Sequence, residues 1–271
     1  MTAHSGRFSG KVAVVTGAAQ GIGFATASRL GREGARIVVA DNAADAAQEA
    51  VQALAAMGVT AIAAVTDLSS CAGAEAAMSA AAQAFGAIHV LVNNVGGTIW
   101  KKPFWHYAEA EIRLEIDRTF WPSLWSARAV IPHMRDSGGA IVNLGSNAVD
   151  GAYRVPYSAS KGAVVALTTA LAVELADFNI RVNCVSPGGT EAPARKTPRN
   201  PNALSPQEQE WERQFMKLIE NEDLLGRFST AEEQAAVIAF LASDDAGHVT
   251  GEVINTGRRG RRVSRTLGFV P

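Results

Sequence analysis

The sequence predicts a single α/β domain built on a doubly wound parallel sheet. Short apolar runs alternate with Ala- and Leu-rich stretches of helical length along nearly the whole chain, which is the doubly wound pattern. Runs such as Val-Ala-Val-Val and Ile-Val-Val-Ala contain no polar residue, which is typical of strands buried on both faces of a parallel sheet. No Pro/Ser-rich linker divides the 271 residues, so we expect one domain over 1–271.

Seven strands are expected, at 12–16, 36–40, 61–66, 88–93, 140–144, 181–186 and 252–254. The segment 76–100 lacks Asp, Glu, Lys and Arg and resembles a membrane span in composition. Because Gly86, His89 and Asn93 interrupt it, it is predicted to form a helix, a turn and a core strand instead.

One composition shift follows the sixth strand. Residues 187–202 are rich in Pro, Gly and basic side chains, and a polar helical segment follows from Ser205. We expect 188–227 to form a substrate-binding lobe within the domain.

Composition and charge exclude several classes of function. The net charge is -1, but five arginines lie in 258–271, so the remainder is acidic and predicts no nucleic-acid-binding face. Cys71 and Cys184 lie far apart and the histidines show no ligand spacing, so neither a disulfide framework nor a metal site is predicted. The N-terminus has no apolar signal-peptide segment, so we expect a cytoplasmic protein that binds no membrane.

A glycine-rich loop, Thr-Gly-Ala-Ala-Gln-Gly-Ile-Gly at 16–23, follows the first strand and begins the first helix. Its glycines let the backbone approach a pyrophosphate, whose charge the helix N-terminus stabilises. An ordinary Gly-rich turn is the alternative, but the position between strand and helix favours phosphate binding. The cofactor-binding candidates in this loop are Gly17, Gln20, Gly21, Ile22 and Gly23.

Asp41 ends the second strand, where a carboxylate accepts hydrogen bonds from the adenosine ribose hydroxyls. No Arg or Lys in the neighbouring loops would bind a 2′-phosphate. Two like charges about 4 Å apart repel by roughly 4 kcal/mol at an effective dielectric of about 20. The sequence therefore predicts NAD rather than NADP as cofactor. An Asp that only caps the next helix is the alternative.

Tyr157 and Lys161 lie four residues apart in a predicted helix and therefore share one face. The preceding strand ends in Gly-Ser, which places the Ser146 hydroxyl at the ligand-binding edge of the sheet. A free phenol has a pKa near 10, which a nearby ammonium and the positive nicotinamide ring lower. We expect Tyr157 to accept an alcohol proton during hydride transfer, with Ser146 bound to the same oxygen and Lys161 holding the nicotinamide ribose.

Together these motifs resemble the short-chain dehydrogenase/reductase family over essentially the whole chain. Further matches are Asp67 after the third strand, Asn93-Asn94 after the fourth and Pro187-Gly188 after the sixth. The resemblance implies a Rossmann fold, a hydride-transferring enzyme and a homotetramer. It adds to the cofactor-binding residues Asp67, Leu68, Asn94, Tyr157, Lys161, Pro187, Gly188 and Thr190.

The chain departs from the family pattern in two places. Alignment on Pro132-His133-Met134 puts Thr119 where members have an Asn that relays protons to the lysine. A threonine hydroxyl can also hold a water, so Thr119 is a candidate catalytic residue. After the last strand, Asn-Thr-Gly-Arg at 255–258 replaces the usual Asp-Gly-Gly.

Two stretches, 93–104 and 187–192 followed by 198–200, resemble the cis-dihydrodiol dehydrogenases of aromatic carboxylate breakdown, which act on the diols of benzoate, toluates and p-cumate. The resemblance implies oxidation of a ring cis-diol to a catechol, with loss of CO2 in the benzoate case. Candidate substrate residues are Trp100 and Phe104 beside the ring, and Arg195, Lys196 and Arg199 at the carboxylate.

Other interpretations stay open at this point. A short-chain reductase of 3-oxoacyl thioesters, or of another ketone, fits the same catalytic set. A catalytically weak NAD-binding regulator is suggested only by the two departures from the family pattern, Thr119 and the altered sequence at 255–258. We expect Trp121 and Trp125 to pack in the core or at a subunit interface, and the basic residues of the lobe also fit a solvated face.

Overall fold

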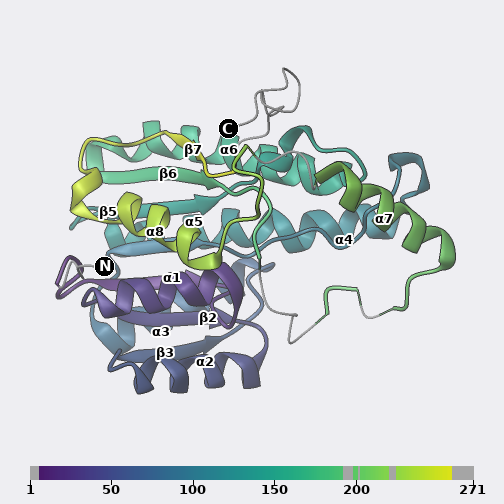
Figure 1. The fold of residues 1–271 in the computed structure, drawn as a ribbon. Helices are drawn as coiled ribbons and strands as arrows, with labels where there is room; N and C mark the ends of the chain where they lie inside the picture. Colours follow the sequence, from purple (N-terminus) through teal and green to yellow (C-terminus); the bar gives the residue numbers. More distant parts are fainter. Residues whose placement is uncertain (1–5, 192–197, 201, 220–223, 258–271) are drawn as a thin grey trace, which may run out of the picture.

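The computed structural model describes residues 6–191, 198–200, 202–219 and 224–257. Its centre is a seven-stranded sheet in the order β3-β2-β1-β4-β5-β6-β7, in which every neighbouring pair is parallel (Figure 1). The strands are β1 Val12–Thr16, β2 Arg36–Asp41, β3 Ala61–Val65, β4 Val90–Asn93, β5 Gly139–Leu144, β6 Ile180–Ser186 and β7 Val253–Asn255. The strand order reverses between β1 and β4, which is where doubly wound sheets bind ligands.

Helices cover both faces of the sheet, because a parallel strand is reached only by a connection that crosses a face. α1, α2 and α8 pack on one face, and α3, α5 and α6 on the other. The helices are α1 Gly21–Arg32, α2 Ala44–Ala56, α3 Cys71–Phe85, α4 Glu109–Thr119, α5 Trp121–Met134, α6 Val155–Leu175, α7 Pro206–Ile219 and α8 Ala231–Ala242.

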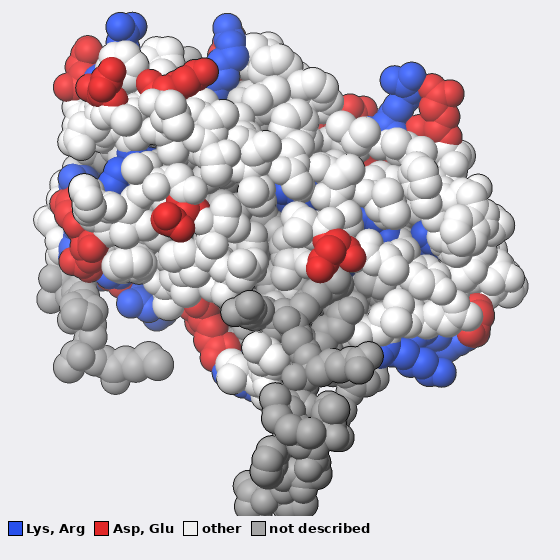
Figure 2. Space-filling model, turned by 90° about the horizontal axis from the view of Figure 1, so that it is seen from above, with Lys and Arg blue, Asp and Glu red and all other residues white. Residues whose placement is uncertain are grey.

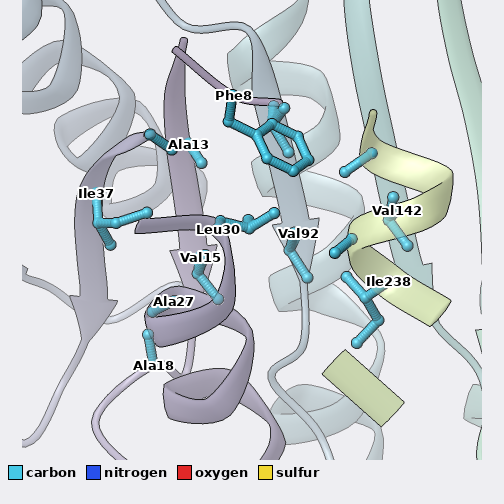
Figure 3. Close-up of a cluster of buried hydrophobic side chains, with 14 of the residues drawn as sticks. Phe8, Ala13, Val15, Ala18, Ala27, Leu30, Ile37, Val92, Val142 and Ile238 are labelled. Carbon is cyan, nitrogen blue, oxygen red and sulfur yellow. The ribbon is translucent and has the colours of Figure 1, made fainter. Parts of the chain in front are cut away.

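Apolar side chains fill both interfaces between the sheet and its helices. On one face, Val15 of β1 lies in a cluster with Leu30 of α1 and Ile238 of α8 (Figure 3). Its neighbour Val14 points to the opposite face and packs in a cluster with Met78 of α3. This is why the strand sequences are continuously apolar rather than alternating.

All seven predicted strands are present, and their ends differ from the predicted ones by no more than two residues. The prediction for 76–100 is also confirmed. α3 ends at Phe85, Gly86 takes a left-handed conformation (φ 80°), and β4 follows within the core.

One helix among the described residues is long and apolar enough to cross a membrane, by length and composition alone. This is α6, extended by the 3-10 turn η3 (Ala176–Phe178). Ala172 and Leu175 of α6 pack in the core cluster with Ile180 and Val182 of β6. The helix therefore lies against the sheet, as a core helix of an α/β domain does.

Charged surface side chains form local ion pairs. On the face in Figure 2, acidic and basic side chains are scattered, and most of the surface between them is uncharged. Arg113, for example, forms an ion pair with Glu109 one turn away in α4, with 2.7 Å between the guanidinium nitrogen and the carboxylate oxygen.

α7, which lies between β6 and α8 in the chain, extends past the carboxyl ends of the strands, at the right in Figure 1. Ser229 N donates to Gly189 O at 2.9 Å, and the hydroxyls of Ser229 and Thr190 are 3.0 Å apart. These contacts close the base of the predicted lobe. An ion pair between Lys101 and Glu212 connects α7 to the loop after β4.

Candidate active site

A cleft of about 970 Å³ opens at the carboxyl ends of the strands. Its walls come from the loops after the six strands β1 to β6, the start of α6 and the lobe. The predicted residues that line it are Gly17, Gln20, Gly21, Ile22, Asp41, Asp67, Leu68, Asn94, Ser146, Tyr157, Lys161, Pro187, Gly188, Thr190 and Arg199. The structure thus brings the cofactor-binding and catalytic candidates into one cleft, whose volume is at the upper end for small-molecule sites.

The glycine-rich loop is shaped for close approach of a phosphate. Gly17 (φ 62°) and Gly21 (φ 59°) take left-handed conformations that favour glycine. A Cβ on Gly23 would lie 2.3 Å from Gly17 O, so α1 could not approach the loop. Asn94 Nδ2 donates to Thr16 O at 2.9 Å and to Gly17 O at 3.1 Å, and so braces the loop from β4. With no acidic residue in the first turn of α1, this cradle fits a pyrophosphate.

Two carboxylates lie at the β2 and β3 end of the cleft. Asp41 accepts from Ala19 N at 3.2 Å and from Ala43 N at 3.1 Å, which places its charge beside the phosphate loop. The N-cap of α2 is Ala43, so Asp41 does not cap that helix. Asp67 accepts from the backbone and hydroxyl of Ser69 at 3.0 and 2.8 Å. This end of the cleft fits the adenosine of a dinucleotide.

The three catalytic candidates meet where β5 and α6 reach the cleft. Ser146, Tyr157 and Lys161 are 8%, 8% and 2% exposed, so all three are shielded from bulk water. Lys161 Nζ donates to Leu144 O at 2.5 Å and lies 6.0 Å from the centroid of the Tyr157 ring. Ser146 Oγ accepts from Ala148 N at 3.1 Å, which orients the hydroxyl. The predicted sharing of a helix face by Tyr157 and Lys161 is confirmed.

Burial sets the charge of Lys161. Mainly through desolvation, the pKa of this ammonium is lowered to about 8, with Cys184 acting against the shift and Arg199 in the same direction as burial. The side chain is therefore still mostly protonated at neutral pH. Gly96 has a φ of 145°, which favours glycine, and a Cβ there would also lie 2.9 Å from Nζ.

Thr119 lies behind that wall, at the end of α4. It is fully buried, and its Oγ1 has no hydrogen-bond partner among the described residues. Its methyl group is 3.4 Å from where a Cβ on Gly96 would lie, on the same side as Lys161. Thr119 does not line the cleft, but its methyl group and the Lys161 ammonium both approach Gly96.

Arg199 is the member of the predicted basic cluster that the structure describes; Arg195 and Lys196 lie outside the described residues. Its guanidinium donates to the carbonyl oxygens of Gly96 and Gly97. Arg199 therefore links the lobe to the loop after β4, a role that its sequence context did not indicate.

Glu115 of α4 was missed by sequence reasoning. Its carboxylate is fully buried. It accepts a hydrogen bond from Ile99 N at 3.0 Å and so fixes the loop after β4, which Arg199 also contacts. Burial raises its pKa to about 7, against the opposing effects of these hydrogen bonds and of Arg199. The available signal was its spacing of four residues from Thr119, which puts both on one helix face.

The predicted aromatic residues do not line the cleft. Trp100 lines a separate pocket of about 190 Å³, and Tyr107 Oη donates to its carbonyl oxygen at 2.7 Å. Phe104 is 49% exposed. Trp121 and Trp125 stack on α5 with centroids 5.5 Å apart and also lie outside the cleft. The apolar side chains that line the cleft include Ile22, Leu68, Val95, Leu114, Leu144, Phe215, Met216, Ile219 and Phe228.

Arg154 lines the cleft and was also missed by sequence reasoning. It is the N-cap of α6, three residues before Tyr157, and its guanidinium lies over the Tyr157 ring. The spacing by nearly one helical turn was the available signal.

The family model of the short chain dehydrogenases matches residues 11–203, and this chain belongs to that family. The 1,6-dihydroxycyclohexa-2,4-diene-1-carboxylate dehydrogenase of Acinetobacter baylyi is 48% identical over 252 residues, 93% of this chain and 96% of that protein. The Pseudomonas putida enzyme of the same name is 45% identical over 90% of each chain. NAD+-bound xylitol dehydrogenase superposes with a TM-score of 0.81 at 29% identity, over 93% of this chain and 99% of that one.

These similarities agree with the geometry of the cleft. The chain is an oxidoreductase that uses a nicotinamide cofactor, and the family resemblance stated from its motifs is confirmed.

Proposed function

We propose that this enzyme oxidises the cis-dihydrodiol of an aromatic carboxylate to a catechol, with NAD+ as hydride acceptor. One observation carries the proposal. Ser146, Tyr157 and Lys161 open into the same cleft as the phosphate loop and Asp41, in a chain 48% identical to a dihydrodiol carboxylate dehydrogenase. Bound NAD+ supplies the electron-pair acceptor; the chain's own residues handle the proton and the orientation.

Tyr157 accepts the proton of the reacting hydroxyl, and Ser146 Oγ hydrogen-bonds the same oxygen as it becomes a carbonyl. The ammonium of Lys161, 6.0 Å from the Tyr157 ring centroid, stabilises the negative charge of a phenolate. Burial of all three side chains strengthens these interactions by excluding water. Thr119 is proposed to hold a water behind Lys161 for proton exchange with solvent.

The reaction balances without a further reactant. The carbinol hydrogen leaves with its electron pair, and the hydroxyl proton passes to Tyr157, which leaves a ring ketone. When the neighbouring ring carbon bears the carboxylate, the product is a β-keto carboxylate. Its bond to CO2 breaks, the electron pair forms the ring double bond of a catechol, and the oxygen recovers a proton. Where the carboxylate lies elsewhere on the ring, enolisation gives the catechol with CO2 retained.

NAD is the proposed form of the cofactor, because the Asp41 carboxylate lies beside the phosphate loop where a 2′-phosphate would meet it. A cytoplasmic homotetramer is the proposed state, and sedimentation velocity of the purified enzyme would measure the assembly.

A substrate panel tests the function. NADH formation from 1,6-dihydroxycyclohexa-2,4-diene-1-carboxylate should exceed that from the same cyclohexadiene diol without the carboxylate. A 3-oxoacyl thioester with NADH should react far more slowly. Faster thioester reduction would establish the reductase alternative, and inactivity on the whole panel would favour the regulator.

A further inference from the structure

Tyr153 has a strained backbone close to the catalytic tyrosine. Its φ is 65°, a left-handed conformation that bulky residues rarely adopt. Among the described residues, the other non-glycine with a positive φ is Asn179, and asparagine tolerates this conformation. Such strain persists only where surrounding contacts hold the residue in place, and it is found most often at functional sites. Tyr153 lies four residues before Tyr157 and does not itself line the cleft.

Two hydrogen bonds hold the backbone of Tyr153 from the loop after β4. Lys102 N donates to Tyr153 O at 2.7 Å, and Tyr107 Oη donates to the same oxygen at 3.1 Å. Lys102 is 7% exposed, and its ammonium donates to Glu111 of α4 at 2.6 Å. Burial, together with the charges of Glu115 and Glu111, raises the pKa of Tyr107, so its phenol stays protonated and remains a donor. The carbonyl oxygen of Tyr153 is therefore held by two separate donors.

The side chain of Tyr153 reaches α7. Its Oη donates to Gln214 Oε1 at 2.7 Å. The Gln214 amide donates in turn to Glu210 Oε1 at 3.0 Å, one turn earlier in α7, which orients it. The next residue of α7 is Phe215, whose ring packs against Arg154. Tyr153 thus contacts the loop after β4 through its backbone and α7 through its side chain.

Tyr157 depends on contacts outside its own helix, because it lies in the first turn of α6. Helical hydrogen bonding begins with Ser158 N, which donates to Arg154 O at 2.9 Å. The N–H groups before it in the first turn have no partner within the helix, and helix ends open more readily than helix centres. The segment just before α6 must therefore hold this turn in place. Tyr153 belongs to that segment and directly precedes the N-cap, Arg154.

We propose that Tyr153 is a positioning residue, which fixes the first turn of α6 and couples the placement of Tyr157 to α7 through its bond to Gln214. This inference rests on the proposed role of Tyr157 as the base. Proton transfer needs Tyr157 within hydrogen-bond reach of the reacting hydroxyl, and a displacement of about 1 Å can cost about 10²-fold in rate. α7, which lines the cleft through Phe215 and Met216, thereby helps to set the position of the base.

The test removes the Tyr153–Gln214 bond from either side, in Tyr153→Phe and in Gln214→Met. In each variant kcat should fall about 2- to 10-fold, as expected for one hydrogen bond, while KM changes less than about twofold. The double variant should lose no more than either single one, because all three lack the same bond. Gln209→Met is the matched control, since Gln209 is also exposed on α7 but donates to Leu204 O at 3.0 Å, and its kcat should match wild type.

Hydrogen exchange gives a second readout that needs no turnover. Amides at 158–162, at the start of α6, should exchange about 2- to 10-fold faster in Tyr153→Phe and in Gln214→Met, because the lost bond no longer stabilises the closed helix end. The same amides in Gln209→Met should exchange as in wild type. NADH binding should stay near wild type in all of these variants.

An unchanged kcat or unchanged exchange in Tyr153→Phe would overturn the inference. Losses that multiply in the double variant would also overturn it, because they would show two independent effects instead of one bond. An equal loss in Gln209→Met would indicate a general loosening of α7 and would likewise overturn it. If wild type oxidises no diol, the proposed function fails, while hydrogen exchange still decides whether Tyr153 and Gln214 hold the start of α6.

Discussion

Replacement of Asp41 by Asn tests the cofactor preference most directly. The structure places both carboxylate oxygens against backbone amides, 3.2 Å from Ala19 N and 3.1 Å from Ala43 N, beside the phosphate loop. A 2′-phosphate on the adenosine ribose would meet this charge at about 4 Å, which costs roughly 4 kcal/mol at an effective dielectric of about 20. That corresponds to about 10³-fold in kcat/KM, and solvent screening at this partly exposed site reduces it to about 10²-fold.

We therefore expect wild type to prefer NAD over NADP by about 10²- to 10³-fold in kcat/KM. Asp41→Asn should lower the ratio of kcat/KM with NAD to kcat/KM with NADP to about tenfold or less. The kcat/KM with NAD should also fall, because the ribose hydroxyls lose a charged hydrogen-bond acceptor. The assay is initial-rate kinetics with both cofactors at low and high salt. Asp67→Asn removes the same charge at the end of the next strand, and we expect it to alter the ratio less. A wild-type enzyme faster with NADP, or a ratio unchanged in Asp41→Asn, would refute the reasoning.

Three further predictions concern Tyr157, Thr119 and the buried carboxyl group of Glu115. Tyr157→Phe should reduce turnover to below a few per cent (about 10²-fold or more) while NADH binding by fluorescence stays near wild type; substantial residual activity would remove Tyr157 as the base. Thr119→Val deletes a buried hydroxyl that has no hydrogen-bond partner among the described residues, so unfolding free energy should stay constant or rise by about 1 kcal/mol. If that hydroxyl holds a relay water, proton release slows, whereas an unchanged pH–rate profile means that protons leave by another route. The pKa of Glu115 rises from its ordinary 4.5 to about 7 on folding, so between these values the folded chain binds more protons than the unfolded chain. Its unfolding free energy should therefore fall by about 3 kcal/mol as pH rises through this window, and urea titrations of Glu115→Gln should lack that part of the slope.

Local sequence pattern was sufficient for the sheet and for the cofactor loop. The run at 12–16 becomes β1 with the predicted bounds, because a strand buried on both faces favours apolar residues. The spacing of Tyr157 and Lys161 determined that they share a helix face, because helical periodicity is a property of the chain itself. Parallel strands end at one edge, which is why Ser146 could be placed beside them before any contact was known.

The walls of the substrate site, in contrast, were decided by contacts between distant segments. The bond from Arg199 to Gly97 joins residues 102 positions apart, and nothing in the local run of basic residues predicts that a backbone carbonyl is the partner. Trp100 faces another pocket because Glu115 and Tyr107 hold the backbone of its loop. Arg154 approaches Phe215 only because the lobe folds back over α6. Composition and periodicity determine which face of a helix or strand is buried. Loops have no such periodicity, so the side chains that meet across a cleft depend on how the loops pack in three dimensions.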